Sequence, residues 1–351
     1  VDLLTGGFPC QSFSVAGKGL GFADTRGTVF FHVARAIEQV QPKAFILENV
    51  KNLVSHDKGK TIDTIIKTLN EIGYTVDYTI LNSKYYGVPQ NRDRVFIVGI
   101  KDGETEEWQV EGTNVLAKSK KRISSYDWSK TFNFPFPTDD TVTNQLVDVL
   151  EPESDVPEQL YLSSEKTETL IKAILEKDER LGRTNALRML GLLDMKGMHS
   201  TRRVYDPNGL CPTLTTMGGG NTEPKILVAG NANPPQQRTN GQVYCPILSP
   251  DKITTRQNGR RIKDNNEEMF TLTAQDRHGV VIYDEVVDLS SYVVRKLTPK
   301  ECWRLQAFPD WAYEKAAEVN SFSQLYKQAG NSITVTVAEA VMKKLLGYME
   351  Q

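Results

Sequence analysis

The first hundred residues alternate between strand-like and helix-like segments, and this alternation restricts the possible folds more than any other feature of the sequence. Short apolar runs of buried-strand length occupy 1–4, 44–47, 75–81 and 95–100. Between them, residues 27–40 and 61–69 carry apolar side chains at helical spacing. Strands that alternate with helices predict βαβ units, and therefore an α/β fold built on a parallel or mostly parallel sheet.

The rest of the chain divides into three further segments. From about 101 to 165 the sequence becomes charged, proline-containing and rich in Ser and Thr, which predicts a linker. Residues 166–290 are rich in Gly, Asn, Thr and Arg and contain short strand-like runs at 225–228 and 279–282, so we expect a smaller, irregular second domain. Residues 291–351 return to helical spacing and are expected to rejoin the first domain, which spans 1–100.

Composition and charge exclude several classes of protein. The 351 residues are 39% hydrophobic and 25% charged, as in ordinary globular proteins, and no apolar run reaches membrane-spanning length. The four cysteines form no Cys-x-x-Cys pair, so we expect no disulfide framework, no metal site and a cytoplasmic setting. Because the net charge is −2, nucleic-acid binding needs a local basic cleft. The basic clusters at 118–122, 202–203 and 260–261 fit either such a cleft or ordinary solvated faces.

A cysteine stands just after the first predicted strand. In the segment Gly-Phe-Pro-Cys-Gln-Ser at 7–12, Cys10 lies at the carboxyl end of that strand. Ligands bind at the carboxyl ends of strands in open α/β sheets, and a partly exposed turn near a helix start favours the thiolate. A small buried hydrophobic residue is the alternative interpretation of Cys10, and this motif alone leaves both open.

Two further motifs flank neighbouring strands. Glu48, in Glu-Asn-Val at 48–50, follows the strand 44–47 and points toward the same edge of the sheet as Cys10. Arg92 and Arg94, in Gln-Asn-Arg-Asp-Arg at 90–94, directly precede the strand 95–100. Arginine forks suit carbonyl and phosphate oxygens. A helix cap or a surface ion pair is the alternative explanation for Glu48.

Five motifs in order resemble the cytosine-C5 DNA methyltransferase family, of the prokaryotic or phage restriction-modification type. They are Pro-Cys-Gln at 9–11, Glu-Asn-Val at 48–50, Gln-x-Arg-x-Arg at 90–94, Arg-Lys-Leu-Thr-Pro-Lys-Glu-Cys at 295–302 and Gly-Asn-Ser at 330–332. The resemblance implies a Rossmann-like methyltransferase sheet with a smaller irregular target-recognition domain. It assigns 1–100 to the catalytic part, 101–165 to a linker, 166–290 to target recognition and 291–351 to a C-terminal segment returning to the catalytic domain.

The resemblance also implies roles for the four central residues. Cys10 attacks C6 of a cytosine flipped out of double-stranded DNA and forms a covalent intermediate. Glu48 engages N3 and the exocyclic amino group, and Arg94 binds the cytosine O2. Arg92 lies nearby in support or on the DNA backbone. S-adenosylmethionine supplies the methyl group that C5 receives.

Residue-by-residue resemblance extends to cofactor and DNA contacts. The implied cofactor-binding residues are Pro9, Val29, Asn331 and Ser332. The implied DNA-binding residues are Gln11, Ser14, Gly17, Lys18, Thr213, Gly218, Gly219, Thr271 and Arg295. The chain carries two Thr-Leu-Thr elements, at 213–215 and 271–273, and the sequence leaves open which one serves the target base.

The family's Phe-x-Gly-x-Gly cofactor loop is not found in the sequence. We therefore expect the first strands of the sheet and this loop on an N-terminal segment or a second polypeptide. Two alternatives stay open at this point: a tRNA cytosine-C5 methyltransferase, and a DNA-binding fragment that is inactive without its N-terminal cofactor-binding half. The length of the region between 100 and 295 favours DNA, because reading a duplex needs a sizeable recognition surface.

Overall fold

The first sheet holds the strands β1 (Leu3–Gly7), β2 (Ala44–Val50), β3 (Tyr74–Asn82) and β4 (Asp93–Lys101) in the order β1-β2-β4-β3. The computed structural model describes residues 1–8, 29–162, 186–195, 197–217, 222–229, 242–248, 278–284 and 292–350. β1 pairs with β2 in parallel, whereas β4 is antiparallel to both β2 and β3.

The expectation of a mostly parallel sheet is therefore wrong for β4. The connection 83–92 between β3 and β4 contains one short turn, η4 (Ser83–Tyr85). A parallel crossover takes about a dozen residues or more and usually a helix. The short connection instead brings the chain back antiparallel, with Asn82 opposite Asp93.

Helices cover both faces of this sheet. α1 (Val29–Val40) and α2 (Lys60–Glu71) pack on the face that contains Phe45 and Leu47, and α3 (Val115–Ser124) adds Ile123 to the same core. α8 (Val335–Met349) packs on the opposite face, over Ala44 and Ile46. The alternation along β2 explains this division, because successive side chains of a strand point to opposite faces. The two helices predicted at 27–40 and 61–69 are confirmed as α1 and α2.

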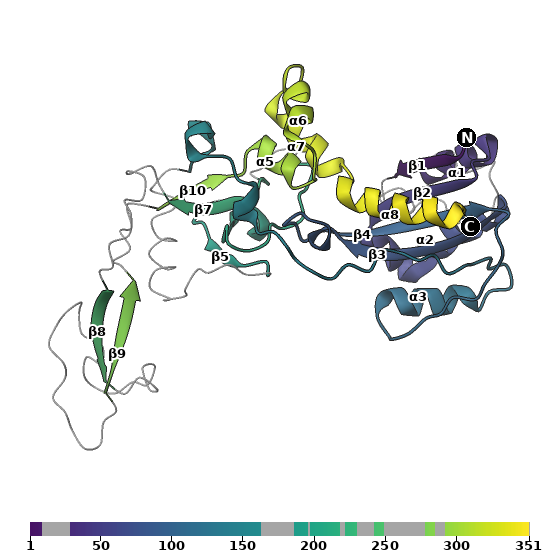
Figure 1. The fold of residues 1–351 in the computed structure, drawn as a ribbon, viewed down its shortest axis with the longest axis horizontal. Coiled ribbons are helices and arrows are strands. Elements are labelled where there is room, and N and C mark those ends of the chain that lie inside the picture. Colours follow the sequence, from purple (N-terminus) through teal and green to yellow (C-terminus); the bar gives the residue numbers. More distant parts are fainter. Residues whose placement is uncertain are drawn as a thin grey trace.

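A second sheet lies to the left of the first in Figure 1 and has the order β10-β7-β6-β5. Its strands are β5 (Met189–Leu192), β6 (Arg203–Tyr205), β7 (Lys225–Ala229) and β10 (Tyr292–Lys296). A separate antiparallel pair is formed by β8 (Gln242–Leu248) and β9 (His278–Asp284). The strand-like runs at 225–228 and 279–282 are thus confirmed as parts of β7 and β9.

Short helices pack on this second sheet. α5 (Pro299–Arg304) and α7 (Phe322–Asn331) share a core with β7 and with the segment 211–217, and α6 (Asp310–Ala317) contacts the same core. The short 3-10 turns are η2 (Lys51–Val54), η3 (His56–Gly59), η5 (Leu146–Val149), η6 (Glu153–Asp155), η7 (Glu158–Leu160) and η8 (His199–Arg202). Within the described ranges, the chain forms no helix with the length and apolar character of a membrane span.

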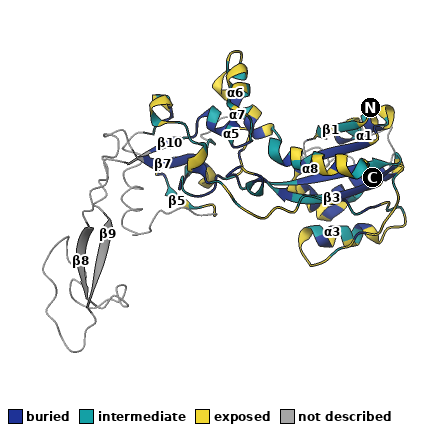
Figure 2. Ribbon diagram, viewed as in Figure 1, coloured by how far each residue is buried: buried dark blue, intermediate teal, exposed yellow. Residues whose placement is uncertain are grey.

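The first sheet with α1, α2, α3 and α8 forms a first region, and the second sheet with α5, α6 and α7 forms a second. The two regions are linked where α7 ends and α8 begins. Figure 1 shows α8, in yellow, running from the second region back across the first sheet. Segment 101–162 also packs on both: Trp108 and Phe132 lie in the cores of the first sheet, and Leu146 lies in the core of the second. Figure 2 shows the buried residues concentrated along the two sheets.

Candidate active site

Glu48 and Arg94 lie on the α8 face of the first sheet, at the edge where β1 and β2 end. Gly7 pairs in register with Glu48, and Val50 pairs with Arg94. A Cβ atom on Gly7 would lie 3.6 Å from Glu48 Oε2, so the end of β1 runs beside the carboxylate. The sheet therefore brings together the predicted Glu-Asn-Val and Gln-x-Arg-x-Arg motifs with the strand that leads to Cys10.

Glu48 and Arg94 form a largely buried ion pair. Arg94 Nε lies 2.9 Å from Glu48 Oε1, and their side chains are 14% and 17% exposed. The N–H does not point closely enough at the oxygen to make a hydrogen bond, so Oε1 is a buried acceptor without one among the described residues. Burial raises the pKa of Glu48, although Arg94 and Arg92 oppose that rise. The site thus contains a carboxyl group with an increased tendency to keep its proton.

Arg92 is buried, and within the described residues its guanidinium donates only to backbone carbonyls. Its Nη1 donates to Leu214 O at 3.2 Å, and its Nη2 donates to Gly330 O at 3.1 Å and Ser332 O at 2.8 Å. Its Nε has no hydrogen-bond partner within the described ranges. Burial, reinforced by the charge of Arg94, lowers the pKa of Arg92 to about 10, so it stays cationic at neutral pH. Arg92 joins segments that are far apart in the sequence.

The Thr-Leu-Thr element at 213–215 lies against the Gln-x-Arg-x-Arg segment. Asn91 N donates to Cys211 O at 2.9 Å, and Cys211 N donates to Pro89 O at 2.7 Å. Thr213 Oγ1 donates to Asn91 O at 2.6 Å. These bonds hold the segment so that buried Leu214 faces Arg92 and the threonines at 213, 215 and 216 are exposed. The other element, which includes Thr271, lies outside the described residues.

Asn49 is a site residue whose role the sequence reasoning missed. It is 2% exposed, and its Nδ2 donates to Phe8 O at 2.6 Å while its Oδ1 accepts from Val50 N at 2.8 Å. Phe8 itself packs against Phe30 at the start of α1, with ring centroids 5.3 Å apart. Asn49 therefore fixes the end of β1 two residues before Cys10. The sequence signal that could have indicated this role is the position of Asn49 directly after Glu48, which places its side chain on the opposite face of β2.

A chain of hydrogen-bonded, buried polar side chains supports the connection 83–92, which includes the start of the Gln-x-Arg-x-Arg motif. Gln90 Nε2 donates to Leu305 O at 3.1 Å, and Gln306 Nε2 lies 3.5 Å from Gln90 Oε1. Thr334 Oγ1 donates to Gln306 Oε1 at 2.8 Å and lies 2.8 Å from Ser83 Oγ. Because buried polar groups are costly unless they are hydrogen-bonded, this set fixes the start of α8 against the connection 83–92.

The three predicted cofactor-binding residues that the structure describes lie at helix ends. Val29 begins α1 and is 42% exposed, and Asn331 ends α7 with its side chain exposed. Ser332 is half-buried, and its hydroxyl donates to Ala329 O at 2.9 Å. A cavity of about 510 Å³ at the carboxyl end of β3 is lined by none of these residues.

Several predicted residues lie outside the part of the chain that the structure describes. They are Pro9, Cys10, Gln11, Ser14, Gly17, Lys18, Gly218, Gly219 and Thr271. The basic cluster at 118–122 lies among the described residues, and two of its side chains form ion pairs within the first region. Lys120 pairs with Asp77 at 2.5 Å and Arg122 pairs with Asp63 at 2.8 Å. These pairs do not support a basic cleft at 118–122.

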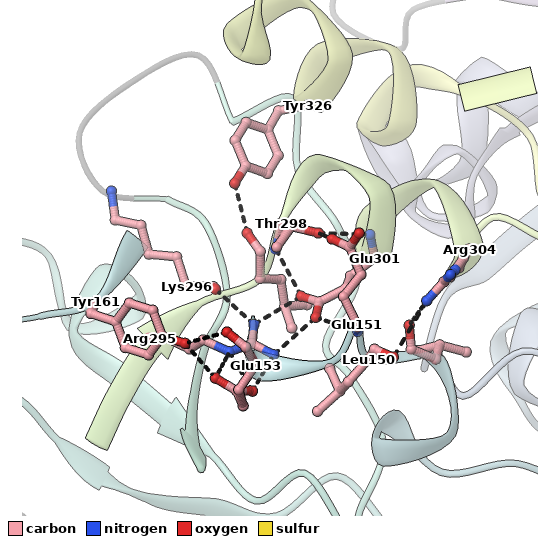
Figure 3. A network of polar contacts seen from close by, with 12 residues as sticks. Leu150, Glu151, Glu153, Tyr161, Arg295, Lys296, Thr298, Glu301, Arg304 and Tyr326 are labelled. Carbon is pink, nitrogen blue, oxygen red and sulfur yellow. Dashed lines mark hydrogen bonds and ion pairs between the residues drawn. The ribbon is translucent and has the colours of Figure 1, made fainter. Parts of the chain in front are cut away.

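Arg295, predicted to contact DNA, is instead fully buried in an ion-pair network (Figure 3). Its Nε donates to Glu153 Oε1 at 2.9 Å, and its Nη1 and Nη2 donate to the two carboxylate oxygens of Glu301 at 3.0 and 2.9 Å. Glu301 also closes a capping box with Thr298 at the start of α5. Its Nη1 also donates to Lys296 O at 3.1 Å, so among the described contacts Arg295 keeps no free donor for a phosphate, and the predicted DNA contact conflicts with this geometry.

The chain is similar to several known proteins. A family model described as C-5 cytosine-specific DNA methylase matches residues 1–347. The orphan methyltransferase M.Rho11sI of Bacillus phage rho11s is 41% identical over 98% of this chain and 84% of that protein. The type II methyltransferase M.HpaII of Haemophilus parainfluenzae is 33% identical over 98% of this chain and 72% of that protein. The solved structure of S. pombe Dnmt2 methyltransferase covers 100% of this chain and 79% of its own, with 15% identity and a TM-score of 0.48.

Proposed function

The chain belongs to the C-5 cytosine-specific DNA methylase family and is a DNA cytosine-5-methyltransferase, and from this premise we propose that Cys10, Glu48 and Arg94 together activate a cytosine flipped out of a specific double-stranded DNA sequence. The observation that carries the proposal is the Glu48–Arg94 pair beside the end of β1. Cys10 follows Gly7 by three positions in the sequence, and a chain of three residues spans at most about 11 Å.

The other cysteines are poorer candidates for the nucleophile. Cys211 and Cys302 are fully buried, and burial raises the pKa of both thiols, which opposes formation of the reactive thiolate. Cys245 lies in β8, far along the chain from the Glu48–Arg94 pair. Cys10 is the cysteine whose position in the sequence fits the pair.

The proposed reaction proceeds through a covalent adduct. The Cys10 thiolate forms a bond to C6, and the electron pair of the C5–C6 double bond is displaced, making C5 nucleophilic. Glu48, whose pKa is raised, donates a hydrogen bond at N3, while Arg94 binds O2. C5 takes the methyl group, then loses its proton to a base as the sulfur–C6 bond breaks and the thiolate is restored. S-adenosylmethionine, the donor that the family implies, supplies the methyl group when bound.

Two of the described residues have side chains whose chemistry suits a site for that donor. Val29 presents an exposed apolar side chain at the start of α1. Asn331 presents an exposed carboxamide that makes no hydrogen bond within the described part of the chain. An apolar wall and a free amide suit a ligand with both apolar and polar parts. We propose that Val29, Asn331, Ser332 and Pro9 hold the donor, and the source of the Phe-x-Gly-x-Gly loop stays a prediction.

Of the two Thr-Leu-Thr elements, we propose that the one at 213–215 serves the target base. Its support is the contact of Thr213 and Leu214 with the backbone of Asn91 and the guanidinium of Arg92. The sequence that is recognised depends on side chains that reach the groove edges.

Methyl transfer tests the proposed function directly. The protein, with any polypeptide that co-purifies with it, is incubated with S-adenosylmethionine labelled in the methyl group and with either duplex DNA or tRNA. We expect label in DNA alone, at cytosines of one sequence that bisulfite sequencing then identifies. Label in tRNA alone would exclude the DNA assignment, and DNA binding without methyl transfer would indicate the inactive fragment.

A further inference from the structure

Arg92 contacts two segments to which different ligands are assigned. Leu214 belongs to the segment 213–217, which leads into the glycines predicted to approach DNA. Gly330 and Ser332 flank Asn331 in the turn between α7 and α8, which is predicted to contact the cofactor. One guanidinium group therefore holds the backbone of both segments at once. Neither contact involves an acidic side chain, so the geometry depends on the planar fork of arginine.

The same two segments also touch each other directly. A Cβ atom on Gly330 would lie 2.0 Å from Thr215 O and 2.9 Å from Thr216 Cα. The backbone of one segment thus packs against the end of α7 with no room for a side chain between them. The Arg92 charge at the carboxyl end of α7 is also favourable with respect to the helix dipole. A shift of either segment must therefore be transmitted to the other.

We propose that Arg92 is a positioning residue that couples DNA binding at 213–217 to cofactor binding at 330–332. This inference rests on the proposed function, since that function assigns the two ligands. Arg92 also lies within electrostatic range of Glu48 and Arg94. When DNA contacts the segment 213–217, a shift of the Leu214 carbonyl moves the guanidinium bound to it, and the guanidinium moves the turn 330–332. Coupling of this kind is reciprocal, so the cofactor must strengthen DNA binding by the same factor.

The coupling factor is measurable without catalysis. It is the ratio of the Kd of S-adenosylhomocysteine in the absence of DNA to its Kd with saturating duplex DNA that the wild-type protein methylates. For the wild-type protein we expect a factor of about ten, within the usual range for linked sites. In Arg92→Lys, whose single ammonium cannot reach all three carbonyls, we expect the factor to fall to below about two.

Arg304→Lys is the matched control. Arg304 likewise donates to backbone carbonyls, those of Val149 and Leu150, at 3.2 and 3.3 Å, and its described hydrogen bonds reach neither of the two coupled segments. We expect it to keep the wild-type coupling factor even if it lowers the melting temperature. If Arg92→Lys does not fold, Gly330→Ala perturbs the same contact through Thr215 and should reduce the factor in the same way.

Two results would overturn the inference: a wild-type coupling factor of one, or an unchanged factor in Arg92→Lys and Gly330→Ala. Either result, obtained with a wild-type protein that still transfers methyl groups to DNA, would refute the coupling and leave the proposed function intact. A wild-type protein without methyl transfer to DNA would refute the proposed function, and the inference with it.

Discussion

At the residue scale, Glu48 and Asn49 divide two tasks between the two faces of one strand. Glu48 faces α8 and pairs with Arg94, whereas Asn49 points the other way and holds the carbonyl of Phe8. Alternation along β2 thus lets adjacent residues place the acid and fix the strand that carries the proposed nucleophile. The residue types were readable from the motif, but the partner of Asn49 was not, because the contact joins residues distant in the sequence.

Asn49→Ala should slow the reaction of Cys10 and destabilise the fold. Removing the amide leaves the carbonyl of Phe8 buried without its donor, a loss of about 1–3 kcal/mol in the free energy of unfolding. Misplacement of the following residues should slow covalent adduct formation by about tenfold or more. Asn70→Ala is the control, because Asn70 is likewise a buried asparagine whose amide donates to backbone carbonyls, those of Tyr74 and Lys130, away from β1. Equal slowing in both variants would contradict the role given to Asn49.

The raised pKa of Glu48 should appear in the pH dependence of stability. A carboxyl whose pKa in the folded state lies above its ordinary value of 4.5 contributes stability below that value and loses it as the pH rises through the raised pKa. Glu48→Gln cannot titrate. We therefore expect the free energy of unfolding of the wild-type protein, relative to Glu48→Gln, to fall in denaturant titrations as the pH rises above 4.5 through the raised pKa. A rise over this range would mean that attraction to Arg94 outweighs burial.

At the element scale, the turn between α7 and α8 is the point where the two regions meet. α7 belongs to the core of the second sheet and α8 to that of the first, so the short segment between them carries the connection. Arg92 donates to Ser332 O in this segment, and Gln306 accepts from Thr334 Oγ1 and from Val335 N. The backbone of Gly330 also packs closely against that of Thr215, which holds the connection in place.

Gly330→Ala should destabilise the protein by about 1–3 kcal/mol, because the added methyl group would meet the backbone of Thr215. Gly347→Ala, within α8, meets no atom within 4 Å and should stabilise the protein by up to about 1 kcal/mol through helix propensity. The melting temperatures of the two variants should therefore move in opposite directions. A neutral Gly330→Ala variant would show that the segments can separate at no cost.

At the scale of the whole molecule, local pattern predicted the elements better than their arrangement. Apolar spacing gave α1, α2 and the strands of the first sheet, because amphipathic periodicity is a property of neighbouring residues. It did not give the antiparallel direction of β4, which follows from a connection too short for a helical crossover. Arg295 shows the same limit within the site. The family resemblance implied a DNA contact for Arg295, whereas its burial between Glu153 and Glu301 became visible only with the partners in place.

The most direct test of the central claim is to map the covalent adduct with duplex DNA in which 5-fluorocytosine replaces the target cytosine. Fluorine at C5 cannot be lost as a proton is, so the adduct should accumulate with S-adenosylmethionine present and be detected by mass spectrometry. We predict that the DNA is attached to the peptide containing Cys10 and that Cys10→Ser forms no adduct. An adduct that persists in Cys10→Ser, or that maps to Cys211, Cys245 or Cys302, would contradict the account.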